Sequence, residues 1–424
     1  MLDIRTLRDD PDRVRQGALK KRFPDRAKAV DKVLELDAQL RGLIPELDGL
    51  RAAQKQAGKA MGKLSPVERE AVLVEQRELK SRIQGLEARE GELQTAIREQ
   101  ILLVPNVPDP EVPDGIDDTG NVEVRKVGTV PSFAFSPKSH DEIAVARGWL
   151  DVERAATMAG SRNYLLFAEL ALLHDAVLRL ALEHMVKKGF VPVDPPLLVR
   201  DEVMIGTGFF PGGEEQTYRV AEDGLNLIGT AEVPVTAIHA DQILDESDLP
   251  KRYVARSACF RREAGTYGKD TKGLYRVHQF QKVEQVVIDV ADEARSRRHH
   301  EDIVRNSEEV LAALELPYRV VAVCGGDLGV PQAFKYDIEC WMPSRQNWGE
   351  THSASRFYDY QARRLKMRYR ETTSRKVAHC HTLNNTVIAS PRILIPLLEV
   401  HQRADGRVHV PQALRSYLGG RETI

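Results

Sequence analysis

The chain has 424 residues, of which 42% are hydrophobic and 29% charged, and its formal net charge is −2. This length predicts two domains. The balanced charge excludes a protein that binds nucleic acid over its whole surface, so any RNA contact must use a local basic patch. No apolar run approaches the length of a membrane span and no signal-peptide pattern follows Met1, so we expect neither a membrane protein nor a secreted one. Four widely separated cysteines (Cys259, Cys324, Cys340 and Cys380) lack CxxC spacing, which argues against a zinc site or a disulfide framework and favours the cytoplasm.

The first part of the chain, from about residue 28 to residue 103, predicts two long helices. Apolar residues recur at alternating spacings of three and four, which is an a/d heptad seam. The first seam contains Val33, Leu36, Leu40, Leu43, Leu47 and Leu50, and the second contains Val72, Gln76, Leu79, Ile83, Leu86, Glu90, Leu93 and Ile97. Gly62 can end the first helix, and Ser65 with Pro66 can start the second. The helices should therefore fold back as an antiparallel hairpin of about 50 Å, with a kink at Pro45.

Four basic residues near the tip of this arm recur every four residues, so they share one helix face. They are Arg51, Lys55, Lys59 and Lys63. In an arbitrary coiled coil, a solvated charged face is the commoner interpretation of such a pattern.

A linker rich in Pro, Asp and Gly follows at residues 104–120, and a second domain extends over residues 121–424. Periodicity predicts helices at 163–188, 292–314 and 392–401, and strands at 225–228, 253–256, 283–290, 318–323 and 335–340. These elements predict an α+β domain with a mixed or antiparallel sheet. Neither a GxxxxGK[ST] loop nor a GxGxxG turn after a first strand is present, so ATP, if bound, is bound without a P-loop.

The most informative stretch comprises residues 260–265 and 273–285. It holds Arg261 and Arg276, the carboxylates Glu263 and Glu284, and a glycine-containing loop at 264–270. Guanidinium groups match phosphate oxygens bidentately, and glycine lets the backbone approach a ligand closely. This combination suits a site that holds a nucleoside triphosphate against a small amino acid.

This stretch resembles motif 2 of the class II aminoacyl-tRNA synthetases, in the form found in seryl-tRNA synthetases. Residues 189–196 resemble motif 1, residues 229–232 the serine-side segment, residues 349–355 the metal and ATP strand, and residues 382–386 with 390–392 motif 3. The order and spacing of these segments match across nearly the whole chain, including the arm. The resemblance implies an antiparallel class II sheet flanked by helices, preceded by the coiled-coil arm, in a homodimer with Pro196 at its interface.

The resemblance also implies residue roles. Arg261 would bridge the α-phosphate and the substrate carboxylate, and Arg392 would hold the γ-phosphate and stack on the adenine, with Phe280 on the other face of that ring. Both arginines are the expected catalytic residues. The implied ATP-binding residues are Arg261, Arg262, Glu263, Val277, His278, Gln279, Phe280, Glu350, Thr351, His352, Ser353 and Arg392.

Glu350 and Ser353 would hold Mg²⁺, which prefers hard oxygen ligands, whereas His352 between them is expected to be structural. The implied serine-binding residues are Thr230, Ala231, Glu232, Glu284 and Thr386. Polar contacts must supply the specificity, because a site built for a hydroxyl rejects analogues that lack it. Whether Glu284 accepts from the ammonium or from the hydroxyl stays open.

The implied function is a ligase that activates L-serine with ATP, releasing pyrophosphate, and transfers serine to tRNA(Ser), with tRNA(Sec) as an open alternative acceptor. Arg51, Lys55, Lys59 and Lys63 would then contact tRNA through its shape and phosphates. No membrane or DNA partner is implied.

Three alternatives remain. A serine-activating paralogue with a non-tRNA acceptor would not require the arm. A non-catalytic RNA-binding relative would not require the catalytic arginines. A synthetase for threonine or proline is disfavoured by the arm and by residues 229–232.

Overall fold

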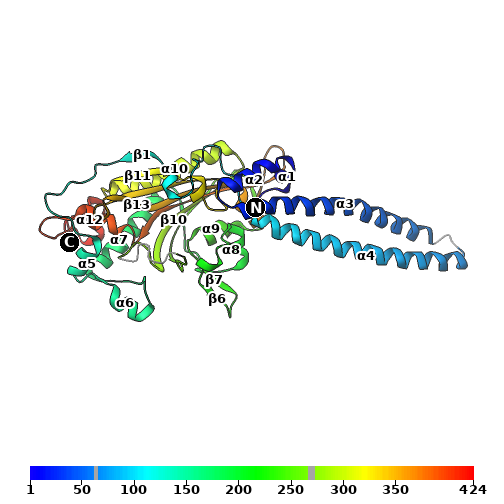
Figure 1. The fold of residues 1–424 in the computed structure, drawn as a ribbon, viewed down its shortest axis with the longest axis horizontal. Coiled ribbons are helices and arrows are strands. Elements are labelled where there is room, and N and C mark those ends of the chain that lie inside the picture. Colours follow the sequence, from blue (N-terminus) through cyan, green and yellow to red (C-terminus); the bar gives the residue numbers. More distant parts are fainter. Residues whose placement is uncertain (62–64, 266–272) are drawn as a thin grey trace. The chain divides into compact units, whose positions relative to one another are not determined.

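The computed structural model describes residues 1–61, 65–265 and 273–424. They form two compact units, Leu2–Val107 on the one hand and Pro108–Ile424 with Met1 on the other. The first unit is helical and contains α1 (Ile4–Asp9), α2 (Pro11–Lys20), α3 (Pro24–Ala60) and α4 (Pro66–Leu103) (Figure 1). The expected helix end at Gly62 lies outside the described residues.

The two long helices lie side by side as an antiparallel hairpin, so the predicted coiled-coil arm is confirmed (Figure 1). Each predicted seam residue is buried or half-buried, and Leu47 is only 1% exposed. Ion pairs cross between the helices beside the seam, such as Arg82 with Glu46. Helix α3 begins at Pro24, four residues before the expected start, because proline is well placed in the first turn of a helix. It continues as one helix through Pro45.

An eight-stranded sheet forms the centre of the second unit, in the order β1-β11-β12-β13-β16-β10-β9-β4. Its strands are β1 (Val122–Val127), β4 (Val191–Val193), β9 (Lys251–Phe260), β10 (Gln279–Asp289), β11 (Tyr318–Ala322), β12 (Phe334–Met342), β13 (Asn347–Tyr358) and β16 (His381–Ser390). Neighbouring strands are antiparallel except for the parallel pair β4 and β9. The predicted α+β fold with an antiparallel sheet is therefore confirmed.

Two long helices, α7 (Ala168–Lys187) and α10 (Glu293–Ala313), pack on one face of this sheet. Successive side chains of a strand point to opposite faces. On β10, Val283 packs in the core beneath these helices and Gln285 donates to the carbonyl of Ile303 in α10. Lys282 and Glu284 therefore project from the other face, where the main cavity lies.

The predicted helix at 163–188 is wrong at its start. Leu165 and Leu166 form the short strand β3, which pairs with β2, and α7 begins only at Ala168. The predicted helix at 292–314 corresponds to α10, for which the side chain of Asp292 accepts from the amide of Arg295 as an N-cap. The predicted helix at 392–401 corresponds to α12 (Leu394–His401).

The remaining elements are short and surround the sheet. The helices are α5 (His140–Ala146), α6 (Val152–Ala159), α8 (Asp201–Thr207), α9 (Glu232–Thr236) and α11 (Tyr360–Leu365). The strands are β2 (Leu150–Asp151), β3 (Leu165–Leu166), β5 (Leu198–Arg200), β6 (Arg219–Val220), β7 (Leu225–Leu227), β8 (Ile243–Asp245), β14 (Arg368–Arg370) and β15 (Val377–His379). Among the helices that the structure describes, none is both long enough and apolar enough to cross a bilayer.

Candidate active site

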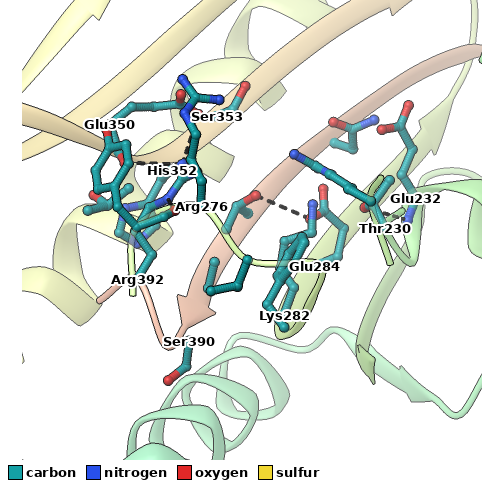
Figure 2. Close-up of a pocket in the computed structure, with 18 of the residues that line it drawn as sticks. Thr230, Glu232, Arg276, Lys282, Glu284, Glu350, His352, Ser353, Ser390 and Arg392 are labelled. Carbon is teal, nitrogen blue, oxygen red and sulfur yellow. Dashed lines mark hydrogen bonds and ion pairs between the residues drawn. The ribbon is translucent and has the colours of Figure 1, made fainter. Parts of the chain in front are cut away.

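A cavity of about 290 Å³ opens on the face of the sheet that carries Glu284 and Thr386. It is lined by Phe209, Thr230, Glu232, Arg261, Glu263, Leu274, Tyr275, Arg276, Val277, Phe280, Lys282, Glu284, Gln332, Lys335, Glu350, Thr351, His352, Ser353, Ser355, Asn384, Thr386, Ala389, Ser390, Pro391 and Arg392. Figure 2 shows the two ends of this pocket: Arg276, Glu350, Ser353 and Arg392 gather at one, and Thr230, Glu232, Lys282 and Glu284 at the other.

Most of the predicted site residues meet in this one cavity. From the predicted ATP set these are Arg261, Glu263, Val277, Phe280, Glu350, Thr351, His352, Ser353 and Arg392, and from the serine set Thr230, Glu232, Glu284 and Thr386. Segments far apart in the chain thus converge because strands β10, β13 and β16 are neighbours in the sheet.

Four residues of the predicted ATP and serine sets do not line the cavity. Arg262 and Gln279 are exposed, and Ala231 is buried just before α9. The ring Nδ1 of His278 lies 3.0 Å from the carbonyl oxygen of Arg261, whose amide donates to the carbonyl of His278.

Arg392 is held at its end of the pocket by several contacts, including an ion pair of 3.8 Å between its Nη1 and Oε1 of Glu350. Its Nε donates to the carbonyl of Tyr275 at 3.2 Å, and its Nη1 donates to the carbonyl of Glu350 at 3.3 Å. Its guanidinium also lies 4.6 Å from the centre of the Tyr275 ring, at a cation–π distance. These contacts fix the charged group in place before any ligand arrives.

Arg261 lies directly after β9, and its Nε donates to the carbonyl of Gly229 at 3.3 Å. Its guanidinium is 5.2 Å from the Phe280 ring centre. The backbone then turns sharply, because Glu263 has a φ of +51°, a left-handed conformation that few non-glycine residues adopt. Glu263 faces Arg276, with 3.5 Å between Oε2 and Nη1.

At the other end, Lys282 and Glu284 form a buried ion pair with 2.6 Å between Nζ and Oε2. Their side chains are only 8% and 2% exposed, and the hydroxyl of Thr386 lies 3.4 Å from the same carboxylate oxygen. Lys282 and Glu284 are two residues apart on one strand, a pattern that is also typical of an exposed face, but in the structure both side chains are buried. Burial raises the pKa of Glu284, while Lys282 opposes the rise.

Glu232 is the second carboxylate of this end. Burial of the carboxyl and then the charge of Glu284 raise the pKa of Glu232 to about 7. Its Oε1 accepts from Nε2 of Gln361 at 2.9 Å, and Gln361 in turn accepts from the hydroxyl of Thr382. The pocket therefore offers two acidic groups with different environments, and one lysine whose charge acts on both.

Hard oxygen donors collect near Arg392. Partial removal of Glu350 from water is outweighed by Arg392 and Lys335, so the pKa of Glu350 is lowered. Lys335 also forms an ion pair with Asp337 at 3.0 Å, and Asp337 lies opposite Ser353 in the pairing of β12 with β13. Within the described residues, no group of three or more His, Cys, Asp or Glu could hold a metal ion by itself.

His352 is almost fully buried, and its Nδ1 lies 2.8 Å from the hydroxyl of Thr351. Burial lowers the pKa of His352 to about 4, so the ring is neutral at physiological pH. It therefore contributes no positive charge to the pocket.

Sequence reasoning missed several lining residues, including Tyr275, Lys335 and Asn384. Tyr275 and Asn384 lie inside the segments that carried the resemblance, so their positions could have been included. Lys335 alternates with Asp337 on β12, but only the sheet order brings β12 next to β13.

The basic residues near the arm tip differ in their surroundings. Arg51 faces acidic groups of both helices, at 2.9 Å from Glu87 and 3.7 Å from Asp48. Lys55 and Lys59 are exposed and form no ion pair with any part of the chain that the structure describes. Lys63 lies outside the described residues. In the second unit, Pro196 is exposed between β4 and β5.

Comparison with known families gives the class of protein. The family model for the tRNA synthetase class II core domain (G, H, P, S and T) matches residues 217–401, which contain nearly all of the cavity lining. The fold and the pocket are thus those of a class II aminoacyl-tRNA synthetase. The model for the seryl-tRNA synthetase N-terminal domain matches residues 1–108.

Full-length relatives identify the family within this class. A serine–tRNA ligase from Deinococcus radiodurans is 44% identical over 100% of this chain and 99% of its own length, and one from Nocardia farcinica is 45% identical over 99% and 98%. The crystal structure of seryl-tRNA synthetase from Pyrococcus horikoshii complexed with ATP superimposes with a TM-score of 0.95 at 40% identity, covering 100% of this chain and 99% of that one. The cytoplasmic serine–tRNA ligase from Naegleria fowleri in complex with AMP gives 0.89 at 31% identity, covering 100% and 98%. The chain belongs to the seryl-tRNA synthetase family.

Proposed function

We propose that this chain activates L-serine with ATP and transfers the serine to the 3′ end of tRNA(Ser). The observation that carries the proposal is one cavity with arginines and hard oxygen donors at one end and a buried Lys282–Glu284 pair at the other. The first end suits a triphosphate and the second a small polar amino acid. Full-length relatives that are serine–tRNA ligases support the same reaction.

In the first step, a carboxylate oxygen of serine attacks the α-phosphorus of ATP. The bond to the β-phosphate oxygen breaks, and seryl-adenylate and pyrophosphate form. Two anions must meet, so the protein chiefly supplies positive charge and alignment. Arg261 would bridge the serine carboxylate and the α-phosphate, and Arg392 would hold the γ-phosphate. Phe280 would pack on the adenine.

Serine would be selected by the buried polar end of the pocket. Glu232 and Glu284 are acceptors for its ammonium and hydroxyl, and Thr230 and Thr386 supply hydroxyl groups beside them. Alanine would leave such groups without a partner, and a buried unsatisfied polar group is costly.

Magnesium fits the chemistry of the donors near Arg392. The carboxylate of Glu350 and the hydroxyl of Ser353 would hold it together with phosphate oxygens and water, which is the usual way in which Mg²⁺ is bound. When bound, the ion would neutralise charge on the phosphates.

The second step transfers serine from the adenylate to a tRNA hydroxyl and releases AMP. We propose residues 1–103 as the tRNA-binding domain, 104–120 as the linker and 121–424 as the catalytic domain, in a cytoplasmic homodimer with Pro196 at the interface. Lys55 and Lys59, with Arg51 and Lys63, would contact RNA phosphates. Phosphate or water would take the proton from the attacking hydroxyl.

Serine-dependent exchange of pyrophosphate into ATP tests the first step, run beside threonine and alanine. Transfer of labelled serine to total tRNA tests the second step. Exchange and transfer with serine would support the proposal. Exchange without transfer would indicate a different acceptor, and no exchange by a folded protein with any of the three amino acids would overturn the proposal.

A further inference from the structure

A buried pair of side chains, His140 and Glu399, lies behind the ATP end of the pocket. His140 is the first residue of α5 and Glu399 belongs to α12, and their side chains are 7% and 0% exposed. Oε1 of Glu399 accepts from the backbone amide of His140 at 3.0 Å and lies 2.9 Å from its ring Nδ1. Neither residue lines the cavity.

Glu399 fixes the tautomer of the histidine. Its carboxylate also accepts from the amide and the hydroxyl of Ser344, each at 2.9 Å. A carboxylate that accepts from all these donors is ionised, and an ionised carboxylate can only accept hydrogen bonds. The hydrogen of the imidazole is therefore on Nδ1, and Nε2 presents a lone pair.

That lone pair accepts a hydrogen bond from the backbone of a residue that lines the pocket. The amide of Leu274 donates to Nε2 of His140 at 3.2 Å. The preceding residue, Gly273, has a φ of +69°, and a Cβ at this position would lie only 2.1 Å from the same nitrogen. Glycine is thus required here, because any larger residue would displace the imidazole.

Leu274 is followed directly by the residue that holds Arg392. Tyr275 contributes its carbonyl to Nε of Arg392 and its ring to the guanidinium. Arg392 itself lies just before α12, and Glu399 lies within that helix. One C-terminal segment therefore contacts residues 274–275 twice, directly through Arg392 and indirectly through Glu399 and His140.

We infer that His140 is a positioning residue for ATP. Its Nε2 holds the Leu274 amide so that Tyr275 presents its carbonyl and its ring to Arg392. This role rests on the proposed function, since Arg392 is the residue proposed to hold the γ-phosphate. It predicts that loss of the Leu274 contact weakens ATP binding and leaves serine binding unchanged, because Thr230, Glu232, Glu284 and Thr386 form no contact with His140 among the hydrogen bonds and ion pairs of the described residues.

Two substitutions of similar polarity separate the contacts of His140. In His140→Asn, an amide nitrogen takes the place of Nδ1 and can still donate to Glu399, but the side chain is too short to reach Leu274. In His140→Gln, the amide oxygen takes the place of Nε2 and can still accept from Leu274, whereas the donor to Glu399 is lost.

The experiment is pyrophosphate exchange by the full-length protein, with ATP and serine varied separately. For His140→Asn we expect the KM for ATP to rise roughly 10-fold, the scale of one lost buried hydrogen bond, with the KM for serine within about twofold of wild type. His140→Gln should restore the KM for ATP to within about threefold. Equal values for the two variants, or an increase for serine as large as that for ATP, would overturn the inference.

Two controls separate this result from other failures. Thermal unfolding of both variants monitors folding, and calorimetric titration with ATP alone measures binding in a variant that is folded but inactive. An unchanged ATP affinity in folded His140→Asn would overturn the inference even if this variant showed no exchange activity. If the wild-type protein shows no serine-dependent exchange, the proposed function fails instead, whatever the variants do.

Discussion

Single residues decide what the serine end of the pocket can bind, and Glu284 is the most constrained of them. It is buried against Lys282, and breaking a buried ion pair by removing one charge leaves the other uncompensated. We expect Glu284→Gln to raise the KM for serine in pyrophosphate exchange by at least about 100-fold, since it also removes an acceptor for the substrate. The KM for ATP should change much less.

A matched control for Glu284→Gln is available on β12. Glu339 forms an ion pair with Arg319 and does not line the cavity. Glu339→Gln should therefore leave both KM values near wild type. Similar effects from the two substitutions would show that general destabilisation, rather than lost recognition, explains the result.

Glu232 predicts a pH dependence of serine binding. Its pKa is raised to about 7, so below pH 7 the carboxyl is protonated and must lose its proton before it can accept from an ammonium. The KM for serine should fall as pH rises towards 7 and level off above it. Exchange assays between pH 6 and 8.5 would show this change in the KM for serine. Glu232→Gln should remove the pH dependence of that KM. The KM for ATP should vary with pH in the same way in the variant and in the wild type.

The ionisation of Glu232 that favours serine binding lowers the stability of the folded protein. A carboxyl with a raised folded-state pKa binds its proton more tightly in the folded state, so Glu232 favours folding at low pH and loses this contribution as pH rises to about 7. Burying a charge that costs stability at the working pH is typical of a binding site.

The site could be predicted from the sequence only as far as its residues lie in contiguous segments. Arg261, Glu284, Glu350 and Arg392 were found because each is in a recognisable segment, and all of them line the pocket. His140 was missed because it lies more than a hundred residues from Leu274, and nothing in the local pattern of α5 indicates that contact. Burial of the Lys282–Glu284 pair likewise depends on sheet packing, which an alternating strand pattern does not reveal.

At the scale of the helix, the two ends of α3 carry basic residues with different surroundings. Lys55 and Lys59 near the tip are exposed and without an ion pair to any described residue, whereas Lys28 pairs with Asp25 and Lys32 with Glu35. We expect the double substitution Lys55→Ala and Lys59→Ala to weaken tRNA binding and to reduce its dependence on salt, because fewer counterions are released.

Filter binding at several salt concentrations measures this effect. Lys28→Ala with Lys32→Ala is the control on the same helix and should leave the salt dependence unchanged. Exchange without tRNA should be normal in both double variants. Equal losses of tRNA binding from both pairs would contradict a site near the tip.

The seam between α3 and α4 makes a separate prediction. Leu47 is 1% exposed, and Leu47→Ala should destabilise the arm by about 2–5 kcal/mol, since it deletes buried methyl groups and leaves a cavity. Hydrogen exchange of the arm amides would detect the loss. The control is Leu73→Ala on α4, at a position that is 43% exposed, and it should have little effect. Equal effects of the two substitutions would show that the seam does not hold α3 and α4 together.

Helices were predicted more reliably than their ends. The heptad seam of the arm is long and regular, so its period identified both helices. The start of α7 was placed too early because Leu165 and Leu166 continue an apolar helical pattern, yet they pair with β2 instead. A two-residue strand has too short a pattern to be recognised locally.

Across the whole molecule, the arm and the sheet belong to separate compact units, and the residues proposed for the first step all lie in the second unit. We expect removal of residues 42–85, bridged by a short turn, to abolish serylation of tRNA but leave serine-dependent exchange intact. A C-terminal truncation of the same length, ending at Cys380, should abolish exchange and ATP binding. Exchange lost in the first variant, or retained in the second, would contradict this division.

The last of the eight strands to appear in the chain is β16, yet it lies between β13 and β10 in the middle of the sheet. Before it is added, β13 and β10 end two separate half-sheets, each with a row of unpaired amides and carbonyls that can pair with other chains. A growing polypeptide therefore carries two open edges until residues 381–390 have left the ribosome. We therefore expect chains that end before residue 381 to aggregate more readily than the full chain, because unpaired strand edges can pair with other chains.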